Sequence, residues 1–378
     1  MVYLNHAATT HPRPPEVVSA VVAALSSAPV HPGRGAGGQD PLTEARFALA
    51  ELLEVDGAER IALLPSATYA LNLAIAGLAP QPGDHVVTTL LEHNSVLRPL
   101  AHAVAAGRLR VSYVSPDRLG RVSAEDVERA LEPRTRLVAV THVSNATGCI
   151  QPIREIAAVA AQKGVALLVD ASQSAGVLPL GHRTLPGRVF VAFAGHKSLL
   201  GPPGIGGLVL ADDRLPQGVV GGTGIRSEEP LHPPELPLRH EAGTPDVPAA
   251  AGLAAGVRLV LARGVSEEGA RRGRLATRLR ARLAATAGVS LSPELEPDPR
   301  AGIVAFRLAG WTPGDLGDAL LRSFDIEVRT GLHCAPLVHA PLGTAPLGTV
   351  RASIGWSTTE TDIDALADAV AALAGGNA

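Results

Sequence analysis

The stretch Val189-Phe190-Val191-Ala192-Phe193-Ala194-Gly195-His196-Lys197-Ser198 combines an element of the fold with a candidate for chemistry. Its apolar first half predicts a buried strand, and Lys197 follows directly after it. Lysine is scarce in this chain, since Lys163 and Lys197 are the only two among 33 basic residues. The amine of a lysine can condense with a carbonyl group, so Lys197 is a Schiff-base candidate. Taken alone, it is also typical of a solvated loop lysine.

A second apolar run, upstream of Lys197, favours the Schiff-base role over the solvated loop lysine. Val165-Ala166-Leu167-Leu168-Val169-Asp170 ends in a carboxylate, as expected for a buried parallel strand whose C-terminal end faces a ligand crevice. Asp170 alone is also typical of a turn or a helix cap. Pyridoxal phosphate, however, requires both a lysine that holds it and an acidic partner for its pyridine nitrogen. The pair of Lys197 and Asp170 therefore favours this cofactor.

Strand-like and helix-like segments alternate over the first 250 residues. Strands are expected at 61–64, 85–89, 109–114, 137–141, 165–169, 189–193 and 206–210, and helices at 14–27, 43–55, 67–79, 123–131 and 153–162. This alternation predicts an α/β domain, residues 15–250, with a mostly parallel seven-stranded sheet.

The pattern changes after about residue 250. Helices are expected at 248–262, 266–285, 313–324 and 359–373, and strands at 303–308, 326–329 and 350–354. We therefore expect a smaller α+β domain over residues 251–378, together with the N-terminal segment 1–14. The proline-rich stretch 228–237 predicts an extended surface loop.

Composition excludes several classes of protein. The chain has 33 Lys and Arg against 36 Asp and Glu, a net charge of -3, with no basic stripe for nucleic acid. It has no apolar run of about 18 residues and no signal-peptide order at its start, so we expect no membrane partner and a cytoplasmic location. Two cysteines, Cys149 and Cys334, are too few for a disulfide framework. No metal site is expected.

The start of the helix after the first strand is a candidate phosphate site. No G-x-G-x-x-G follows that strand, and Gly195-His196-Lys197-Ser198 is not a P-loop, which excludes dinucleotide and ATP folds. Pro65-Ser66-Ala67-Thr68 instead places small and hydroxyl residues at a helix N-terminus, where free N–H groups bind phosphate. Ser66 and Thr68 are candidate ligands, although ordinary capping residues have the same pattern.

Seven sequence strings together resemble a known family. They are Asn5-His6-Ala7-Ala8-Thr9-Thr10, Glu92-His93-Asn94-Ser95, Ser144-Asn145-Ala146-Thr147-Gly148, Val169-Asp170-Ala171-Ser172-Gln173, Gly195-His196-Lys197, Glu241-Ala242-Gly243-Thr244-Pro245 and Arg329-Thr330-Gly331-Leu332-His333-Cys334-Ala335-Pro336. In this order they resemble the class V aminotransferase family and, within it, the group II (SufS-like) cysteine desulfurases and selenocysteine lyases. The resemblance runs from residue 3 to the last helix and implies a fold-type I transferase that depends on pyridoxal phosphate.

The resemblance implies roles around the cofactor ring. Lys197 would bind the cofactor covalently, Asp170 would pair with the pyridine nitrogen, and Gln173 would bind the ring hydroxyl. His93 would stack on the ring face and take part in catalysis. These roles rest on the family and not on the spacing of the residues.

The resemblance also implies phosphate and substrate ligands. Thr68, His196 and, from a neighbouring subunit, Thr244 would hold the phosphate, which implies a homodimer. Asn145 and Arg351 would hold the carboxylate of an amino-acid substrate, with Arg351 using its bidentate fork. Without the resemblance, Arg351 is equally typical of a surface arginine.

Cys334 determines which reaction the resemblance implies. In cysteine desulfurases an enzyme thiolate takes sulfur from L-cysteine, which leaves L-alanine and an enzyme persulfide whose sulfur passes to an acceptor protein. His333 and Arg329 offer a positive setting that would favour the thiolate of Cys334. Cys149 instead is expected to be a small buried apolar residue.

The sequence departs from the family pattern at several positions, and other functions are compatible with the same family. Ala67 and Ala194 replace hydroxyl residues, so a phosphate hydrogen bond is expected to be missing, and Leu332 and the segment 337–343 differ beside Cys334. The alternatives to a cysteine desulfurase are a selenocysteine lyase, a C–S lyase, an aminotransferase, or a scaffold or sulfur-relay partner without turnover. The complete set of site residues argues against the last of these.

Overall fold

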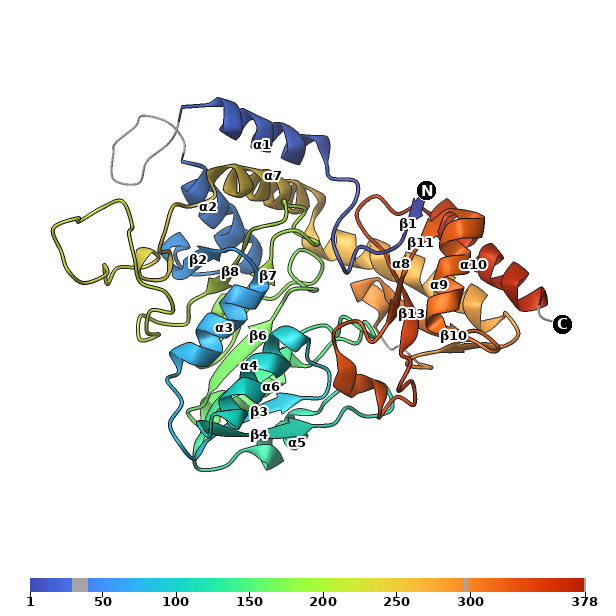
Figure 1. Cartoon of the computed structure of the whole chain (residues 1–378), viewed down its shortest axis with the longest axis horizontal. Coiled ribbons are helices and arrows are strands. Elements are labelled where there is room, and N and C mark those ends of the chain that lie inside the picture. The colour runs from blue at the N-terminus through green and yellow to red at the C-terminus, as the bar shows by residue number, and fades with distance from the viewer. Residues whose placement is uncertain (29–39, 296–297, 377–378) are drawn as a thin grey trace.

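The larger sheet has seven strands in the order β2-β8-β7-β6-β5-β3-β4 (Figure 1). The computed structural model describes residues 1–28, 40–295 and 298–376. The strands are β2 (Ile61–Leu64), β3 (Asp84–Thr89), β4 (Leu109–Val114), β5 (Thr135–Thr141), β6 (Ala166–Asp170), β7 (Val189–Ala194) and β8 (Gly206–Val209). β8 pairs antiparallel with β2 and β7, whereas β7, β6, β5, β3 and β4 pair in parallel. The expected mostly parallel sheet of seven strands is confirmed.

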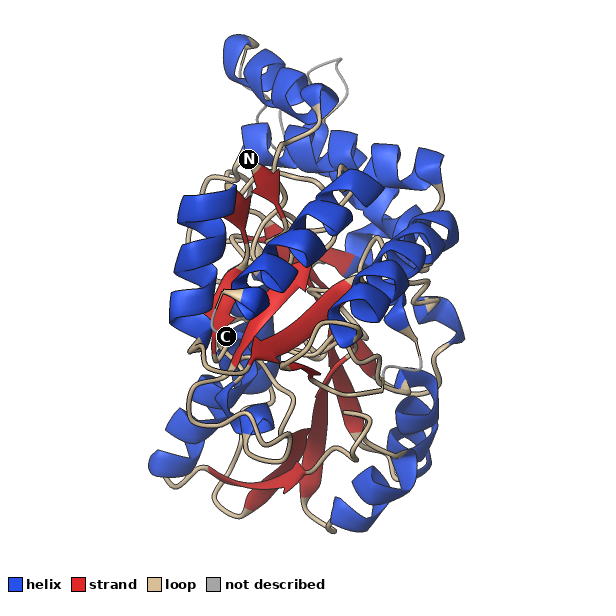
Figure 2. Cartoon of the chain, turned by 90° about the vertical axis from the view of Figure 1, so that its right-hand side faces the viewer, coloured by secondary structure: helices blue, strands red, loops and turns tan. Residues whose placement is uncertain are grey.

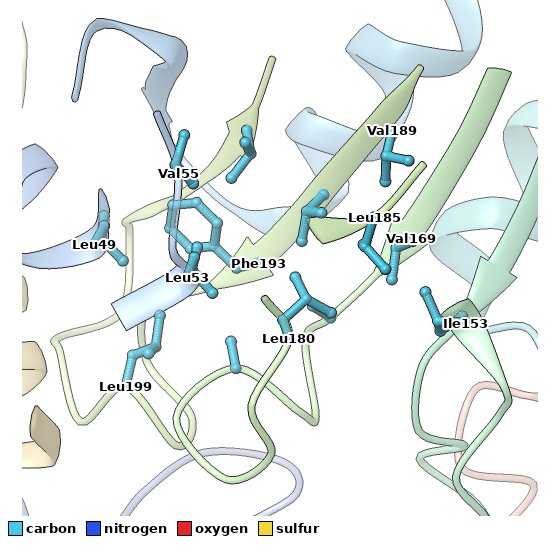
Figure 3. Close-up of a cluster of buried hydrophobic side chains, with 14 of the residues drawn as sticks. Leu49, Leu53, Val55, Ile153, Val169, Leu180, Leu185, Val189, Phe193 and Leu199 are labelled. Carbon is cyan, nitrogen blue, oxygen red and sulfur yellow. The ribbon is translucent and has the colours of Figure 1, made fainter. Parts of the chain in front are cut away.

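Helices cover both faces of this sheet. One face carries α2 (Pro41–Leu53), α5 (Ala124–Ala130), α6 (Ile153–Gln162) and α7 (Val247–Arg263), and the other carries α3 (Ala67–Gly77) and α4 (Asn94–Ala105). Successive strand residues point to opposite faces, so Val169 packs in the first core and Leu168 in the second. Figure 3 shows the first core, in which Phe193 lies near Leu53 and Leu199. Burial on both faces explains why β6 and β7 are almost continuously apolar.

A four-stranded antiparallel sheet forms the centre of the C-terminal part (Figures 1 and 2). Its strands are β9 (Val289–Leu291), β10 (Ile303–Leu308), β12 (Arg329–Gly331) and β13 (Thr349–Ser353), and its helices are α8 (Val265–Ala284), α9 (Pro313–Phe324) and α10 (Glu360–Gly375). Phe306 and Val350 are fully buried in its own core. The domain boundary expected at residue 250 stays a prediction. Leu253 and Val257 of α7, which follow this position, pack in the core of the larger sheet.

The N-terminal segment connects the two parts. β1 (Val2–Tyr3) pairs in parallel with β11 (Ile326–Glu327) beside the smaller sheet. The chain then turns back, and Thr10 donates from its N to the O of His196 (3.1 Å) and from its Oγ1 to the O of Lys197 (2.7 Å). α1 (Pro15–Ser26) follows and packs on α7. The turn that carries Lys197 is therefore tied to the segment that begins at the smaller sheet.

The remaining elements are short. The 3-10 helices are Ala58–Arg60, His182–Thr184, Leu238–His240, Pro299–Ala301 and Pro336–His339. No helix or strand forms over 228–237, and this stretch is largely exposed, as expected. In the described part of the chain no single helix is long and apolar enough to cross a membrane, and α7 and α8 meet that test only together, across a bend of 77°.

Candidate active site

The carboxyl ends of β5, β6 and β7 open onto a cavity of about 210 Å³. Such crevices at strand ends are the usual ligand sites of open α/β sheets. The cavity is lined by nearly all the site residues expected from the sequence: Ser66, Thr68, His93, Asn145, Asp170, Gln173, His196, Lys197, Cys334 and Arg351. The structure thus brings residues from both sheets into one site.

Lys197 and Asp170 face this cavity from neighbouring strands. Asp170 is the last residue of β6, which pairs with β7, and Lys197 lies in the turn that follows β7. Burial lowers the pKa of Lys197 to about 8, an effect that Asp170 opposes and that Arg351 and Arg329 strengthen. A substantial fraction of this amine is therefore neutral near pH 8, and the neutral amine is the nucleophilic form.

Glu92 and His93 lie where β3 passes into α4. Oε1 of Glu92 accepts hydrogen bonds from Thr89 Oγ1 (2.7 Å) and Thr141 N (3.1 Å), and its Oε2 is buried without a partner. Burial raises the pKa of Glu92 to about 8. His93 caps α4 by accepting from Ser95 N (3.0 Å), and burial together with the charge of Lys197 lowers its pKa to about 4. Near pH 7 the first is mainly a neutral acid and the second a neutral imidazole.

The N-terminus of α3 forms a second wall. Ser66 caps this helix, with its Oγ accepting from Tyr69 N (3.4 Å), and Thr68 Oγ1 lies 2.8 Å from Ser95 Oγ. A Cβ on Gly206 of β8 would lie 2.8 Å from the N of Ala67, so only glycine permits this approach of strand and helix. The free N–H groups of a helix start are therefore held at the edge of the cavity.

Arg351 is buried and not a surface arginine. The side chain is 2% exposed, and it donates from Nη1 to Asn145 O (2.8 Å) and from Nη2 to Asn5 Oδ1 (3.2 Å), while its Nε has no partner. Arg329 is its register partner across β12 and β13. Burial, with the charge of Arg329, lowers the pKa of Arg351 to about 9. Two facing arginines of like charge favour an anion between them.

The backbone around Cys334 is held at three consecutive carbonyl groups. The O of Leu332 accepts from His339 Nε2 (3.2 Å), the O of His333 accepts from Asn145 Nδ2 (2.6 Å), and the O of Cys334 accepts from Asn94 N (2.7 Å). His333 and Cys334 have φ values of +52° and +58°, in the left-handed region that side chains rarely adopt. The surrounding bonds therefore maintain a strained turn at the sulfur.

Arg329 places a positive charge next to Cys334. Its Nη2 lies 3.6 Å from the Sγ of Cys334. The expectation that His333 adds to this charge is wrong, because burial and the charge of Arg351 lower its pKa to about 2. Nε2 of His333 instead pairs with Thr349 Oγ1 at 2.9 Å. His333 is a neutral structural residue, and the cationic side chains that interact with Cys334 are Arg329, Arg351 and Lys197.

Several other expected residues can be placed. Gln173 lines the cavity and donates from Nε2 to Ala7 O (2.9 Å). Nδ1 of His196 lies 3.0 Å from Thr9 Oγ1. Thr244 lies instead in a separate cavity of about 370 Å³, so its role at a neighbouring subunit stays a prediction. Cys149 is fully buried, as expected.

Sequence reasoning gave no role to some residues of the site. Ser95 and Ser172 line the cavity, although both stand in the quoted strings, and Glu92 was named only as part of its string. These three residues lie at strand ends and helix caps. Such positions can be assigned to a site only when the neighbouring strands in the sheet are known. Among the described residues, no three His, Cys, Asp or Glu side chains are grouped so that they could hold a metal ion.

Relatives were found by sequence and by structure. The Aminotransferase class-V family model matches residues 2–366. A probable cysteine desulfurase of Methanothermobacter thermautotrophicus is 33% identical over 99% of this chain and 95% of that protein. The apo structure of cysteine desulfurase from Thermococcus onnurineus NA1 matches with a TM-score of 0.90 and 30% identity, over 99% of this chain and 95% of that one. Cysteine desulfurase CsdA from Escherichia coli gives a TM-score of 0.85 and 28% identity, over 98% and 93%.

These matches extend over almost the whole of each chain compared. The TM-scores of 0.90 and 0.85 show that this chain shares its fold with both solved cysteine desulfurases. Enzymes of this family depend on pyridoxal phosphate, and cysteine desulfurases act on an amino acid and pass its sulfur to an acceptor. The chain belongs to the class V aminotransferase family.

Proposed function

We propose that the chain is a cysteine desulfurase that converts L-cysteine to L-alanine and transfers the sulfur to Cys334 and then to an acceptor. The observation that carries this proposal is the meeting of Lys197, Cys334 and Arg351 in one cavity. A lysine, a nucleophilic sulfur and a buried carboxylate-binding arginine are the three groups that the reaction requires. Relatives named cysteine desulfurases at about 33% identity support it.

The residues present fit pyridoxal phosphate as the cofactor. Lys197 would hold it, Asp170 would pair with its pyridine nitrogen, and the start of α3, with Thr68 and His196, would take its phosphate. The unprotonated His93 suits stacking on the ring, because it brings no positive charge there. When bound, the cofactor withdraws electrons from the substrate Cα, so that a proton can leave this atom.

Residues of the chain would bind the substrate, accept its Cα proton and supply the nucleophile. The substrate carboxylate would lie between Arg351 and Arg329, which relieves the repulsion of these facing charges and orients the amino acid. Nζ of Lys197, with its pKa lowered to about 8, is suited to accept the proton from Cα. Nη2 of Arg329, 3.6 Å from the Sγ of Cys334, places a positive charge beside the proposed nucleophile.

The sulfur step itself balances without an external oxidant. The thiolate of Cys334 attacks the substrate sulfur, an S–S bond forms and the C–S bond breaks. The electron pair of the broken bond stays with the carbon skeleton, which becomes alanine after it takes up a proton. Cys334 then holds a persulfide, and a thiol acceptor can remove the outer sulfur.

Finer assignments follow from the same resemblance. We propose the group II subtype, a cytoplasmic location and a homodimer in which Thr244 completes the phosphate site of the partner. The separation of Thr244 from the cavity of its own chain supports this last point.

The deciding experiment supplies the purified, cofactor-loaded protein with L-cysteine and a thiol reductant. We expect equal amounts of alanine and sulfide, together with a change in the visible absorbance of the cofactor. A keto-acid product would identify a transaminase, and protein that cannot be loaded with the cofactor would contradict the proposal altogether.

A further inference from the structure

A groove between α3 and α4 begins at Cys334. It has a volume of about 690 Å³ and shares Thr68, His93, Ser95 and Cys334 with the cofactor cavity. The two helices lie side by side on the same face of the larger sheet (Figure 1). Cys334 therefore faces two spaces, one that holds the cofactor residues and one that the proposed reaction does not use. We call the second space the α3–α4 groove.

The groove is basic, and its charges are unpaired. Arg98 and His102 of α4 line it together with Arg108, and none of its lining residues is an Asp or Glu. Within the described chain neither Arg98 nor Arg108 forms an ion pair, whereas the nearby Arg110 pairs with Glu132 at 2.5 Å. A concave site with unpaired cations attracts anions.

The size and walls of the groove suit a small molecule. Its volume lies within the range of about 300 to 1,000 Å³ that is usual for small-ligand sites. Ile75, Pro99 and Ala103 provide apolar wall, and Asn72 and Gln81 add polar groups to the lining. A stable protein interface would instead involve about 20 to 30 residues of this chain, more than line the groove. The groove therefore fits an elongated organic anion whose reactive end reaches Cys334.

We infer that the α3–α4 groove binds a small thiol bearing carboxylate groups, which accepts the sulfur from Cys334. The inference rests on the proposed function, because it requires a persulfide on Cys334. The acceptor thiolate attacks the outer sulfur, a new S–S bond forms, and the bond to Cys334 breaks with its electron pair. The acceptor leaves as a persulfide, Cys334 is again a thiolate, and no further oxidant or reductant is needed.

The test compares glutathione with its diethyl ester, which carries the same thiol without free carboxylates. Alanine release is measured at saturating cysteine and varied thiol concentration, for wild type and for the double variant Arg98→Gln, Arg108→Gln. We expect the half-saturating glutathione concentration to rise about tenfold in the double variant, with no change for the ester. Arg118→Gln is the matched control, since Arg118 is exposed, forms no ion pair within the described residues and lies outside the groove.

A second readout does not depend on turnover. S-methylglutathione cannot accept sulfur, and calorimetry should show that its binding to the cofactor-loaded wild type is weakened in the double variant. The inference would be overturned if the double substitution changed the half-saturating concentrations of glutathione and of its ester equally. It would also be overturned if the double variant showed a raised KM for cysteine and an unchanged KM for the thiol. A change of oligomeric state in the double variant would also overturn it, since the groove would then face a second copy.

The two proposals can fail separately. Absence of alanine with either thiol contradicts the desulfurase proposal, whereas alanine formation without a preference for the carboxylated thiol contradicts only the acceptor site.

Discussion

The two sheets supply the same cavity with different kinds of side chain. The larger, mostly parallel sheet contributes Asp170 from the last position of β6 and Lys197 from the turn after β7. The smaller, antiparallel sheet contributes Arg329 and Arg351 from within paired strands, and Cys334 from just beyond one of them. Parallel strands gather loops at one edge, whereas antiparallel neighbours set two side chains face to face. Cofactor chemistry and sulfur chemistry therefore have separate structural supports, so a substitution in the smaller sheet should remove the sulfur chemistry while the cofactor stays bound.

Replacing Lys197 should have the largest effect, because both chemistries need the cofactor in place. We expect Lys197→Ala to lower desulfuration by about a thousandfold or more and to abolish covalent attachment of the cofactor. Borohydride reduction followed by mass spectrometry of the peptides measures attachment directly. Lys163→Ala, which changes only an exposed lysine paired with Glu128, should behave as wild type. Substantial turnover by Lys197→Ala would refute the assignment.

Replacing Cys334 should remove only the sulfur chemistry. We expect Cys334→Ala to bind the cofactor and to keep its cysteine-dependent change in absorbance, while alanine formation from cysteine is lost. Mass spectrometry of the wild type after single turnover should show one added sulfur on the peptide of Cys334. Cys149→Ala is the control, since Cys149 is fully buried and outside the cavity. A wild-type rate in Cys334→Ala would show that the persulfide route is wrong.

Replacing Arg351 should weaken substrate binding without releasing the cofactor. Loss of a charged hydrogen bond to the substrate carboxylate predicts a rise of roughly 10- to 100-fold in the KM for cysteine in Arg351→Gln. Steady-state kinetics over a wide cysteine range measures this rise. Arg307→Gln alters an arginine of the same sheet outside the cavity and should leave KM unchanged. A fall in kcat at constant KM would place the carboxylate elsewhere.

Replacing Glu92 should have the smallest effect on activity and a measurable one on stability. The folded-state pKa of about 8 lies above the ordinary value of 4.5, so the folded protein binds more protons between these pH values. Stability from Glu92 is full below about pH 4.5 and is lost as pH rises through 8. Urea unfolding should show this loss in wild type and in the control Glu51→Gln, but not in Glu92→Gln. Parallel pH profiles would show that Glu92 is ionised in the folded state.

Local sequence patterns predicted most of the fold. The helix expected at 313–324 and the strand at 303–308 have these limits in the structure, because their apolar spacing and caps agree. α4 was not expected, although Val96, Leu97 and Leu100 have helical spacing; Pro99 lies within this helix and obscures the pattern. The strand expected at 326–329 divides into β11 and β12, which join different sheets, and pairing partners cannot be seen in a local pattern.

The sequence predicted which residues form the site but not their protonation states. The strand-end pair of Lys197 and Asp170 follows from position alone, since the ends of parallel strands share an edge. The neutral state of His333 follows from its burial among arginines, which depends on residues distant in sequence. The α3–α4 groove likewise arises where the surfaces of two helices meet, and neither helix shows it alone.

The three held carbonyl groups around Cys334 have a kinetic consequence. With the O atoms of Leu332, His333 and Cys334 fixed, the Cα of the cysteine stays in place, and its sulfur can change position only by torsion about the Cα–Cβ bond. Rotamer changes take picoseconds to nanoseconds when unhindered, whereas loop movements take far longer. Movement of the outer persulfide sulfur from the cofactor cavity to the α3–α4 groove would therefore require only torsions about the Cα–Cβ and Cβ–Sγ bonds, without movement of the loop.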